Sequence, residues 1–205
     1  MSNRTSTARV LMLGLLALLF SACSGLIPAA PTPTPVDGIH PYVPPQPLQT
    51  FTLTDQTNQP FTSTTLQGKW VLLAFGYTHC PDVCPDTMIR FKQIKTALGD
   101  AADKVKFVLI GVDTERDTPE ALKTYLANFD PSFIGLTSDF QTLLATAKNF
   151  NVNFAIQQPD ANGNYTVDHT AVSFLLNTDG QIVSFYSYGV DYDAMLSDVR
   201  THVSG

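Results

Sequence analysis

The chain has 205 residues, of which 44% are hydrophobic and 15% are charged, and its formal net charge at pH 7 is −6. A chain of this length and apolar content can bury the core of a single domain without disulfide cross-links, and its composition excludes disorder over most of its length. The negative net charge repels phosphate groups, which argues against nucleic acid as a partner.

The N-terminus has the pattern of an export signal. Two arginines precede an unbroken apolar run over residues 10–20, which is too short for a permanent membrane helix of about 20 residues. Two small residues and then Cys23 follow, an order that resembles the lipobox of bacterial lipoproteins. We therefore expect residues 1–22 to be a signal peptide and Cys23 to carry lipid. The alternative is an ordinary signal peptide followed by an unrelated cysteine. Removal of residues 1–22 would take away two arginines and shift the net charge from −6 to −8.

Residues 23–49 are rich in proline and have little periodic apolar content. Such a segment favours extended polyproline geometry and cannot build a core. We expect it to be a tether between the lipidated cysteine and the folded domain.

Residues 50–205 carry the patterns of a folded α/β domain. Continuous apolar runs over residues 70–76 and 105–113 predict strands buried on both faces. Apolar residues at helical spacing follow Pro85 as far as Gly99, and a second helix is expected to begin near Pro119. The other expected elements are a hairpin over 51–62, a short strand at 133–136, a helix at 140–150, a hairpin over 172–186 and a closing helix at 192–202.

The alternation of strands and helices predicts a parallel sheet core, to which the later hairpin adds antiparallel strands. Periodicity alone supports only a three-layer α/β fold. A cysteine pair at the end of the first buried strand, before the first long helix, favours a redox fold. We therefore expect a thioredoxin-like three-layer fold, with a mixed parallel and antiparallel sheet, helices on both faces and an N-terminal β-hairpin.

Cys80 and Cys84 form the chemical centre of the sequence. Pro85 suits the first position of a helix because it has no N–H to donate, which predicts Cys84 at the N-cap. The partial positive charge of a helix N-terminus favours a thiolate there. In a turn the i to i+4 spacing brings the Cα atoms to about 6 Å, within the range of a disulfide. The pair can therefore hold a metal ion when reduced or form a disulfide when oxidised. A permanent structural disulfide is the alternative.

Two thiolates favour a soft ion such as copper(I), whereas structural zinc takes four protein ligands. A third ligand would be one of the four histidines. His40 lies in the predicted tether, His202 is close to the C-terminus, and His79 directly precedes Cys80, where consecutive side chains point apart. His169 precedes a predicted buried strand and is left as the candidate. A lone loop histidine is more often a surface residue than a ligand, so spacing alone leaves its role open.

Three blocks of the sequence resemble the signatures of the SCO/SenC proteins. They are YTHCPDVCP at 77–85, VDTERDTPE at 112–120 and VDHT at 167–170. The blocks stand in the family's order, and the resemblance covers residues 50–203. It implies a thioredoxin-like fold with Cys80, Cys84 and His169 as copper ligands. Thr114 stands where the family usually has proline.

The same resemblance points to three acidic residues beside the site. Asp113 and Asp117 match acidic positions of the family, although Asp117 could instead begin the following helix. Asp168 is expected to orient His169, as carboxylates commonly do for ligating imidazoles. The alternative for Asp168 is a solvated loop residue.

Members of this family deliver copper to the dinuclear copper site in subunit II of cytochrome c oxidase, or keep the cysteines of that site reduced. The resemblance therefore predicts a copper chaperone for copper(I) or copper(II), which takes the ion from a copper donor protein. It would be lipid-anchored at the extracytoplasmic face of the cytoplasmic membrane.

Two other functions remain open from the residues. A thiol–disulfide reductase would use Cys80 and Cys84 to exchange with a partner's disulfide, and it would not need His169. A peroxidase on the same fold is less favoured. Such enzymes have threonine three residues before the reactive cysteine, whereas this chain has Pro81 three residues before Cys84.

Overall fold

The structure is a computed structural model that describes residues 37–204. The predicted signal peptide over residues 1–22, the predicted lipidation site Cys23 and the first part of the predicted tether lie outside the described residues. All further statements on structure concern residues 37–204.

Two strands made largely of apolar residues form the centre of the main sheet. β4 (Trp70–Gly76) and β5 (Val105–Gly111) run parallel and in register over their whole length. Both strands are buried on both faces, which explains why their sequences are continuous apolar runs rather than alternating ones.

The main sheet has eight strands in the order β1-β10-β9-β4-β5-β6-β2-β3. Pairing is parallel between β4, β5 and β6, and antiparallel elsewhere. The N-terminal hairpin of β2 and β3 therefore lies at one edge, beyond β6. The remaining strands of this sheet are β1 (Ile39–Gln46), β2 (Thr52–Asp55), β3 (Pro60–Thr62), β6 (Ile134–Thr137), β9 (Val172–Leu176) and β10 (Ile182–Ser187).

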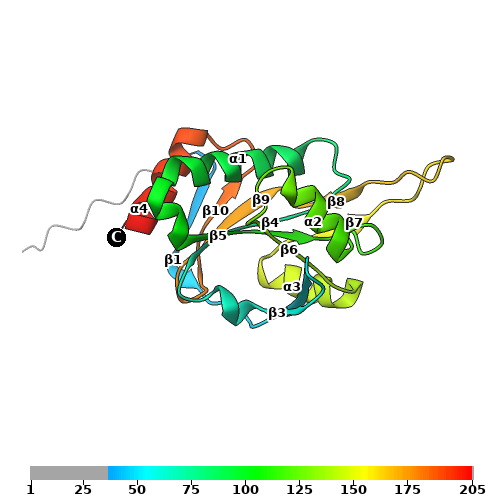
Figure 1. Cartoon of the computed structure of the whole chain (residues 1–205), viewed down its shortest axis with the longest axis horizontal. Helices are drawn as coiled ribbons and strands as arrows, with labels where there is room; N and C mark the ends of the chain where they lie inside the picture. The colour runs from blue at the N-terminus through cyan, green and yellow to red at the C-terminus, as the bar shows by residue number, and fades with distance from the viewer. Residues whose placement is uncertain (1–36, 205) are drawn as a thin grey trace, which may run out of the picture. The chain divides into compact units, whose positions relative to one another are not determined.

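Helices cover both faces of the sheet (Figure 1). Four α-helices and two short 3₁₀ helices are described: α1 (Val83–Leu98), α2 (Pro119–Ala127), α3 (Phe140–Asn149), α4 (Tyr192–Ser204), η1 (Ser63–Leu66) and η2 (Gly99–Lys104). Their ends follow from local chemistry. Thr118 and Asp139 accept hydrogen bonds from backbone amides at the starts of α2 and α3, and Gly99 ends α1 with a positive φ of 55°. None of the described helices is both long enough and apolar enough to cross a bilayer.

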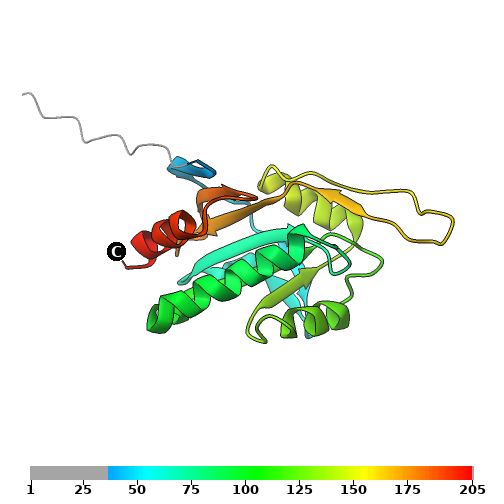
Figure 2. The same cartoon turned by 90° about the horizontal axis from the view of Figure 1, so that it is seen from above.

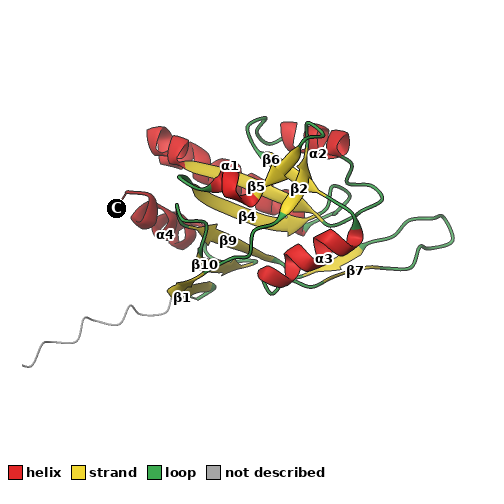
Figure 3. Ribbon diagram, turned by 90° about the horizontal axis from the view of Figure 1, so that it is seen from below, coloured by secondary structure: helices red, strands yellow, loops and turns green. Residues whose placement is uncertain are grey.

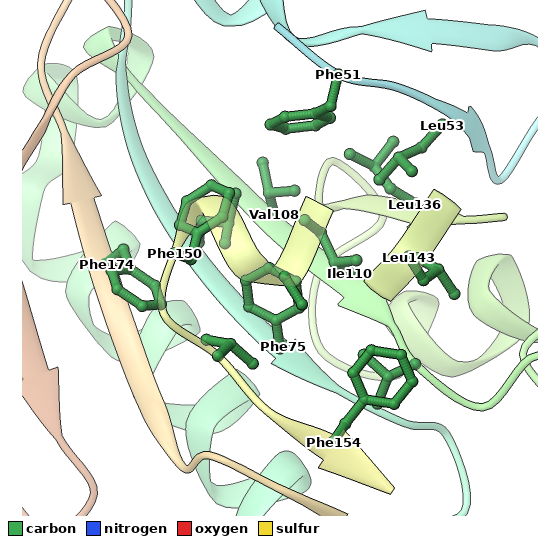
Figure 4. Close-up of a cluster of buried hydrophobic side chains, with 14 of the residues drawn as sticks. Phe51, Leu53, Phe75, Val108, Ile110, Leu136, Leu143, Phe150, Phe154 and Phe174 are labelled. Carbon is green, nitrogen blue, oxygen red and sulfur yellow. The ribbon is translucent and has the colours of Figure 1, made fainter. Parts of the chain in front are cut away.

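Alternate residues of the central strands build two separate cores. On one face, Leu72 and Ala74 of β4 pack with apolar residues of α1, α2 and α4. On the other face, Leu73 and Phe75 pack with α3 and with the aromatic ring of Phe150, which follows that helix. Figure 4 shows this second core, where Phe150 meets the rings of Phe75 and Phe174. Because side chains alternate along a strand, one sheet can hold both helical layers.

A second, two-stranded sheet lies apart from the main one. β7 (Phe154–Ile156) pairs with β8 (Val167–His169), and the loop between them extends away from the rest of the described chain (Figures 2 and 3). We call residues 154–169 the arm. The sequence patterns did not indicate these short strands.

The mixed α/β fold and the order of the predicted elements are confirmed. One expectation is wrong: residues 39–46, assigned to the tether, form the edge strand β1 and pair with β10. Prolines are tolerated there because an edge strand needs ladder hydrogen bonds on one side only. The register shifts between Pro41 and Gln46, where two further prolines lie.

Candidate metal centre

Two sulfurs of one loop and an imidazole nitrogen from a distant part of the chain meet at one point. The sulfur atoms of Cys80 and Cys84 and a ring nitrogen of His169 all lie within 4.8 Å of one another. The Sγ atom of Cys84 is 3.5 Å from Nε2 of His169, although 85 residues separate them. The histidine that sequence spacing left open thus reaches the cysteines. That the three residues hold a metal ion stays a prediction.

The cysteine loop begins where β4 ends. The carbonyl of Gly76 accepts a hydrogen bond from Val112, and the amide of Cys80 donates to the carbonyl of Tyr77 at 3.2 Å. The amide of Cys84 points at the sulfur of Cys80 from 3.4 Å. This amide lies in the first turn of α1, where N–H groups have no partner within the helix.

The expected position of Cys84 at the N-cap is wrong. α1 begins at Val83 with Asp82 as its N-cap, so Cys84 is the second residue of the helix and Pro85 the third. Proline is tolerated throughout the first turn because the amide it lacks would have no acceptor there.

Gly76 makes room for the sulfur of Cys84. A Cβ atom at position 76 would lie 2.8 Å from that sulfur and 3.2 Å from a methyl carbon of Leu109. Such a distance to the sulfur is shorter than real side chains show. Glycine is therefore required at the strand end so that Cys84 can pack against the backbone.

The protonation of Cys84 differs from the expectation drawn from the helix end. The residue is 3% exposed, and burial raises the pKa of its thiol well above the usual range. Desolvation outweighs the hydrogen bond that favours the thiolate, so the metal-free chain holds a neutral thiol at pH 7. A cation that binds here has to displace this proton.

His169 ends β8, and its ring is held between a carbonyl and an aromatic face. Nδ1 lies 3.3 Å from the carbonyl oxygen of Thr170, which only accepts hydrogen bonds, so a proton on Nδ1 leaves the lone pair of Nε2 facing Cys84. The ring packs edge-on against Tyr77, with 6.0 Å between centroids. Burial lowers the pKa of His169, which favours the neutral imidazole that binds metals.

Asp168 does not orient His169, contrary to expectation. Its carboxylate is exposed and accepts a hydrogen bond from the side chain of Gln157 at 2.8 Å. The carbonyl of Thr170 contacts the ring instead. Successive residues of a strand point to opposite sides, so Asp168 faces away when His169 faces the cysteines.

Asp117 fastens the cysteine loop to the loop that follows β5. Its buried carboxylate accepts from both the amide and the hydroxyl of Thr78, at 2.9 and 2.8 Å, and from the amide of Asp113 at 3.2 Å. Burial raises the pKa of Asp117, and these hydrogen bonds oppose that rise. The N-cap of α2 is Thr118 rather than Asp117, so the capping alternative is wrong.

Asp113 is also buried, and two residues that the sequence reasoning missed surround it. Arg116 forms an ion pair with it, and the hydroxyl of Tyr165 donates to it at 2.9 Å. The guanidinium of Arg116 stacks on the ring of Tyr165 at 3.6 Å from the centroid. Both missed residues lie in or beside the signature blocks, at 112–120 and two residues before 167–170, which was the available signal.

The other three histidines lie elsewhere in the described structure. His79 is exposed and contacts the hydroxyl of Thr78, His40 stacks on Phe185, and His202 packs against Trp70. The donor set of the centre is thus two sulfurs and one imidazole nitrogen. Such a set suits a soft ion of low coordination number, and the sulfur pair alone suits disulfide exchange.

Comparisons with known proteins agree on one family. A model described as SCO1/SenC matches residues 43–204. The mouse mitochondrial protein named SCO2 homolog is 33% identical over 156 residues, which cover 75% of this chain and 61% of the mouse protein. This chain therefore spans about three fifths of the length of that relative.

Solved structures show the same likeness. The structure of ScoI from Bradyrhizobium japonicum with copper bound has 38% identity and a TM-score of 0.69, and it covers 76% of this chain and 98% of its own. A structure of BsSco, a member of the Sco family of cytochrome c oxidase assembly proteins in which a disulfide switch was identified, has 26% identity and a TM-score of 0.61. That match covers 78% of this chain and 95% of BsSco.

Proposed function

Because the chain belongs to the SCO1/SenC family, we propose that it binds copper through Cys80, Cys84 and His169 and serves in the assembly of cytochrome c oxidase. The observation that carries the proposal is the convergence of three donor atoms within 4.8 Å, in a chain whose described part has two cysteines.

Burial sets the protonation of the site before a cation binds. Cys84 and His169 are both neutral in the metal-free chain, since burial disfavours their charged forms. Cys80 is partly exposed and gives access to solvent. Copper(I), when bound, would supply the positive charge that stabilises two adjacent thiolates.

We propose further that the copper is cargo. The chain would receive it from a donor protein and pass it by ligand exchange to the dinuclear copper site of oxidase subunit II. A site with one partly exposed sulfur supports transfer, because an incoming thiolate can approach the ion from the side of Cys80.

Copper binding is tested with the full chain, reduced and titrated with copper(I) against a competing chelator. We expect one ion per chain. Cys84→Ser and His169→Ala should each lower the affinity by more than the roughly 10–100-fold that loss of an outer-sphere partner costs. His79→Ala is the matched control and should bind as the unaltered chain does. Unchanged affinity in both ligand variants would rule the site out.

Delivery is tested by mixing the copper-loaded chain with the apo copper domain of oxidase subunit II. We expect the absorption spectrum of the dinuclear site to appear in the acceptor. If the ion stays with the donor while binding itself is normal, the chain holds copper for another purpose.

A second candidate, thiol–disulfide reduction at the same oxidase site, is favoured by the difference between the two cysteines. Cys80 is partly exposed and Cys84 is buried, an arrangement in which Cys80 attacks a partner's disulfide and Cys84 resolves the mixed disulfide. This function does not use His169. An oxidase-assembly defect in Cys80→Ser, with normal assembly in His169→Ala, would favour reduction over copper delivery.

The N-terminal predictions complete the proposal. We propose a signal peptide over residues 1–22, a lipidated Cys23 with a tether up to the domain, and residence at the extracytoplasmic face of the cytoplasmic membrane. The apolar run over residues 10–20 followed by a cysteine supports this. Metabolic labelling with a fatty acid should mark the full chain and not its Cys23→Ser variant, and equal labelling would contradict lipidation at this residue.

A further inference from the structure

We propose that Tyr165, Arg116 and Asp113 form a clamp that positions His169 against the cysteines. Tyr165 and Arg116 would be positioning residues, which act on the arm and touch no metal. The proposal rests on the proposed function, because it explains how a ligand from outside the main sheet is held in place.

The strands of the arm pack into the second core through Phe154 and Val167, but the loop between them has few attachments to the rest of the described chain. His169 is the last residue of β8, and it pairs only with Phe154 of β7 in the small sheet. Between the strands, residues 157–166 are mostly exposed. Within the described chain, hydrogen bonds from this loop to residues outside the arm are made by Tyr165 alone. The rest of the loop bonds to itself or to neighbouring arm residues.

Tyr165 is held at three points. Its hydroxyl donates to Asp113 at 2.9 Å, its backbone carbonyl accepts from the guanidinium of Arg116 at 3.1 Å, and the Cζ atom of that guanidinium lies over its ring, 3.6 Å from the centroid. A planar cation can stack and donate at once, which lysine cannot do.

The other side of the clamp is rigid. Asp113 follows β5, a parallel strand buried on both faces, and its side chain is fully buried. A buried carboxylate requires partners, and Arg116 and Tyr165 supply them. The arm is thus fastened to the loop that follows β5, at the buried side chain of Asp113.

Only a short piece of chain, most of it in β8, separates the clamp from His169. Tyr165 and His169 are four residues apart, and β8 occupies the last three of those positions. Tyr77 completes the connection, because Arg116 lies 6.0 Å from its ring centroid and His169 packs edge-on against the same ring. If Tyr165 is released, the strand that carries His169 loses its outer attachment, and its ring is no longer held 3.5 Å from Cys84.

The test uses Tyr165→Phe in the full chain, with Tyr42→Phe as the matched control. Tyr42 lies in β1 at the far edge of the sheet, where its ring contacts Phe185. In the metal-free protein, we expect amide hydrogen exchange over residues 154–169 to become about tenfold faster in Tyr165→Phe, since a hydrogen bond to a charged group is lost. Exchange in β4 and β5 should not change.

The copper readout separates positioning from plain stability. Tyr165→Phe should lower copper(I) affinity about tenfold, within the range for outer-sphere partners, and should weaken the imidazole signal in copper X-ray absorption. In a His169→Ala background, Tyr165→Phe should have no further effect on copper affinity. Arg116→Lys should lower copper(I) affinity by less than Tyr165→Phe does, because lysine keeps the positive charge beside Asp113 but cannot stack on the ring of Tyr165.

Two results would overturn the clamp. One is unchanged exchange in the arm of Tyr165→Phe, and the other is faster exchange with unchanged copper affinity and imidazole signal. If the unaltered chain binds no copper, the proposed function fails and the clamp is judged on the metal-free protein. The NMR signals of the His169 ring must then move in Tyr165→Phe and stay in place in Tyr42→Phe, and a ring that does not respond rejects the clamp.

Discussion

The two halves of the candidate site are built in different ways. Cys80 and Cys84 lie where the central strand β4 runs into α1, and Cys84 is buried among the core residues. His169 comes from the arm, which belongs to a separate two-stranded sheet. The sulfur side is therefore fixed by β4 and α1, whereas the imidazole side depends on the core packing of Phe154 and Val167 and on the contacts that Tyr165 makes. The contrast predicts unequal responses to substitution, from large at the cysteine loop to small in the arm.

The largest loss of stability is expected from Asp117→Ala. Three donors from Thr78 and Asp113 would lose their acceptor inside the protein. We expect a loss of about 3 kcal/mol in the free energy of unfolding, since each unsatisfied buried donor costs about 1–3 kcal/mol and some would relax toward water. Urea unfolding gives the measurement. Thr118→Ala is the control at the neighbouring residue. It removes the N-cap of α2 and should lower the free energy of unfolding by about 1 kcal/mol. Equal losses in the two variants would contradict the fastening role of Asp117.

Substitution of one glycine in each region allows a direct comparison of the cysteine loop with the arm. Gly76→Ala inserts a methyl group 2.8 Å from the sulfur of Cys84, and we expect about 1–3 kcal/mol of destabilisation together with weaker copper binding. Gly163→Ala, in the arm, meets open space but sits at a φ of 83°, so its cost is a backbone strain of about 1 kcal/mol. Thermal unfolding and copper titration of both variants measure the difference. Normal copper binding by Gly76→Ala would show that the sulfur can move.

Alkaline pH should weaken the cysteine side. The pKa of Cys84 is raised in the folded chain, so above the usual thiol pKa of about 8.5 the unfolded state loses its proton first. The metal-free chain should therefore lose stability as the pH rises above about 8.5, by at most about 1.4 kcal/mol per pH unit from this group. Copper affinity should rise with pH over the same range because binding displaces the proton. Cys84→Ala should flatten the stability curve, and an unchanged slope would assign it to another group.

Mild acid should act on the arm side. Burial lowers the pKa of His169, so below about pH 6.5 the unfolded chain binds a proton that the folded site resists. Stability should fall as the pH drops through this window, and faster hydrogen exchange in residues 154–169 should accompany the fall. His169→Gln removes the effect if this residue causes it, and an unchanged acid profile in that variant would assign the effect to another group.

The smallest effect is expected from Asp168→Asn. Its carboxylate contacts Gln157 on the exposed side of the arm and makes no hydrogen bond to the ring of His169. Copper affinity should change by less than about twofold, well below the 10–100-fold typical of a carboxylate that orients a ligating imidazole. A larger loss would restore the role that the resemblance assigned to this residue.

The same contrast explains how much the sequence could predict. β4, β5 and α1 follow from apolar runs and helical spacing, because burial on two faces leaves an unbroken apolar run and burial of one helix face leaves a periodic one. The cysteine half of the site could be located for this reason, at the end of a strand that the pattern identifies.

The arm and β1 could not be predicted in that way. β7 and β8 have three residues each, too few for a period to show, and β1 is rich in proline because an edge position tolerates it. Tyr165 meets Asp113 across 52 positions of the chain, so no local pattern marks the contact. The histidine was found through its signature block, but what holds it in place needed the tertiary structure.

The close contact at Gly76 has a consequence for the order in which a bound ion would be released. The backbone of β4 closes one side of the Cys84 sulfur, so that sulfur cannot retreat from the ion without disturbing the sheet. Cys80 and His169 are both less buried than Cys84. If copper leaves by stepwise exchange, the bond to Cys84 is the last to break, and an acceptor protein must compete with the one ligand that belongs to the core.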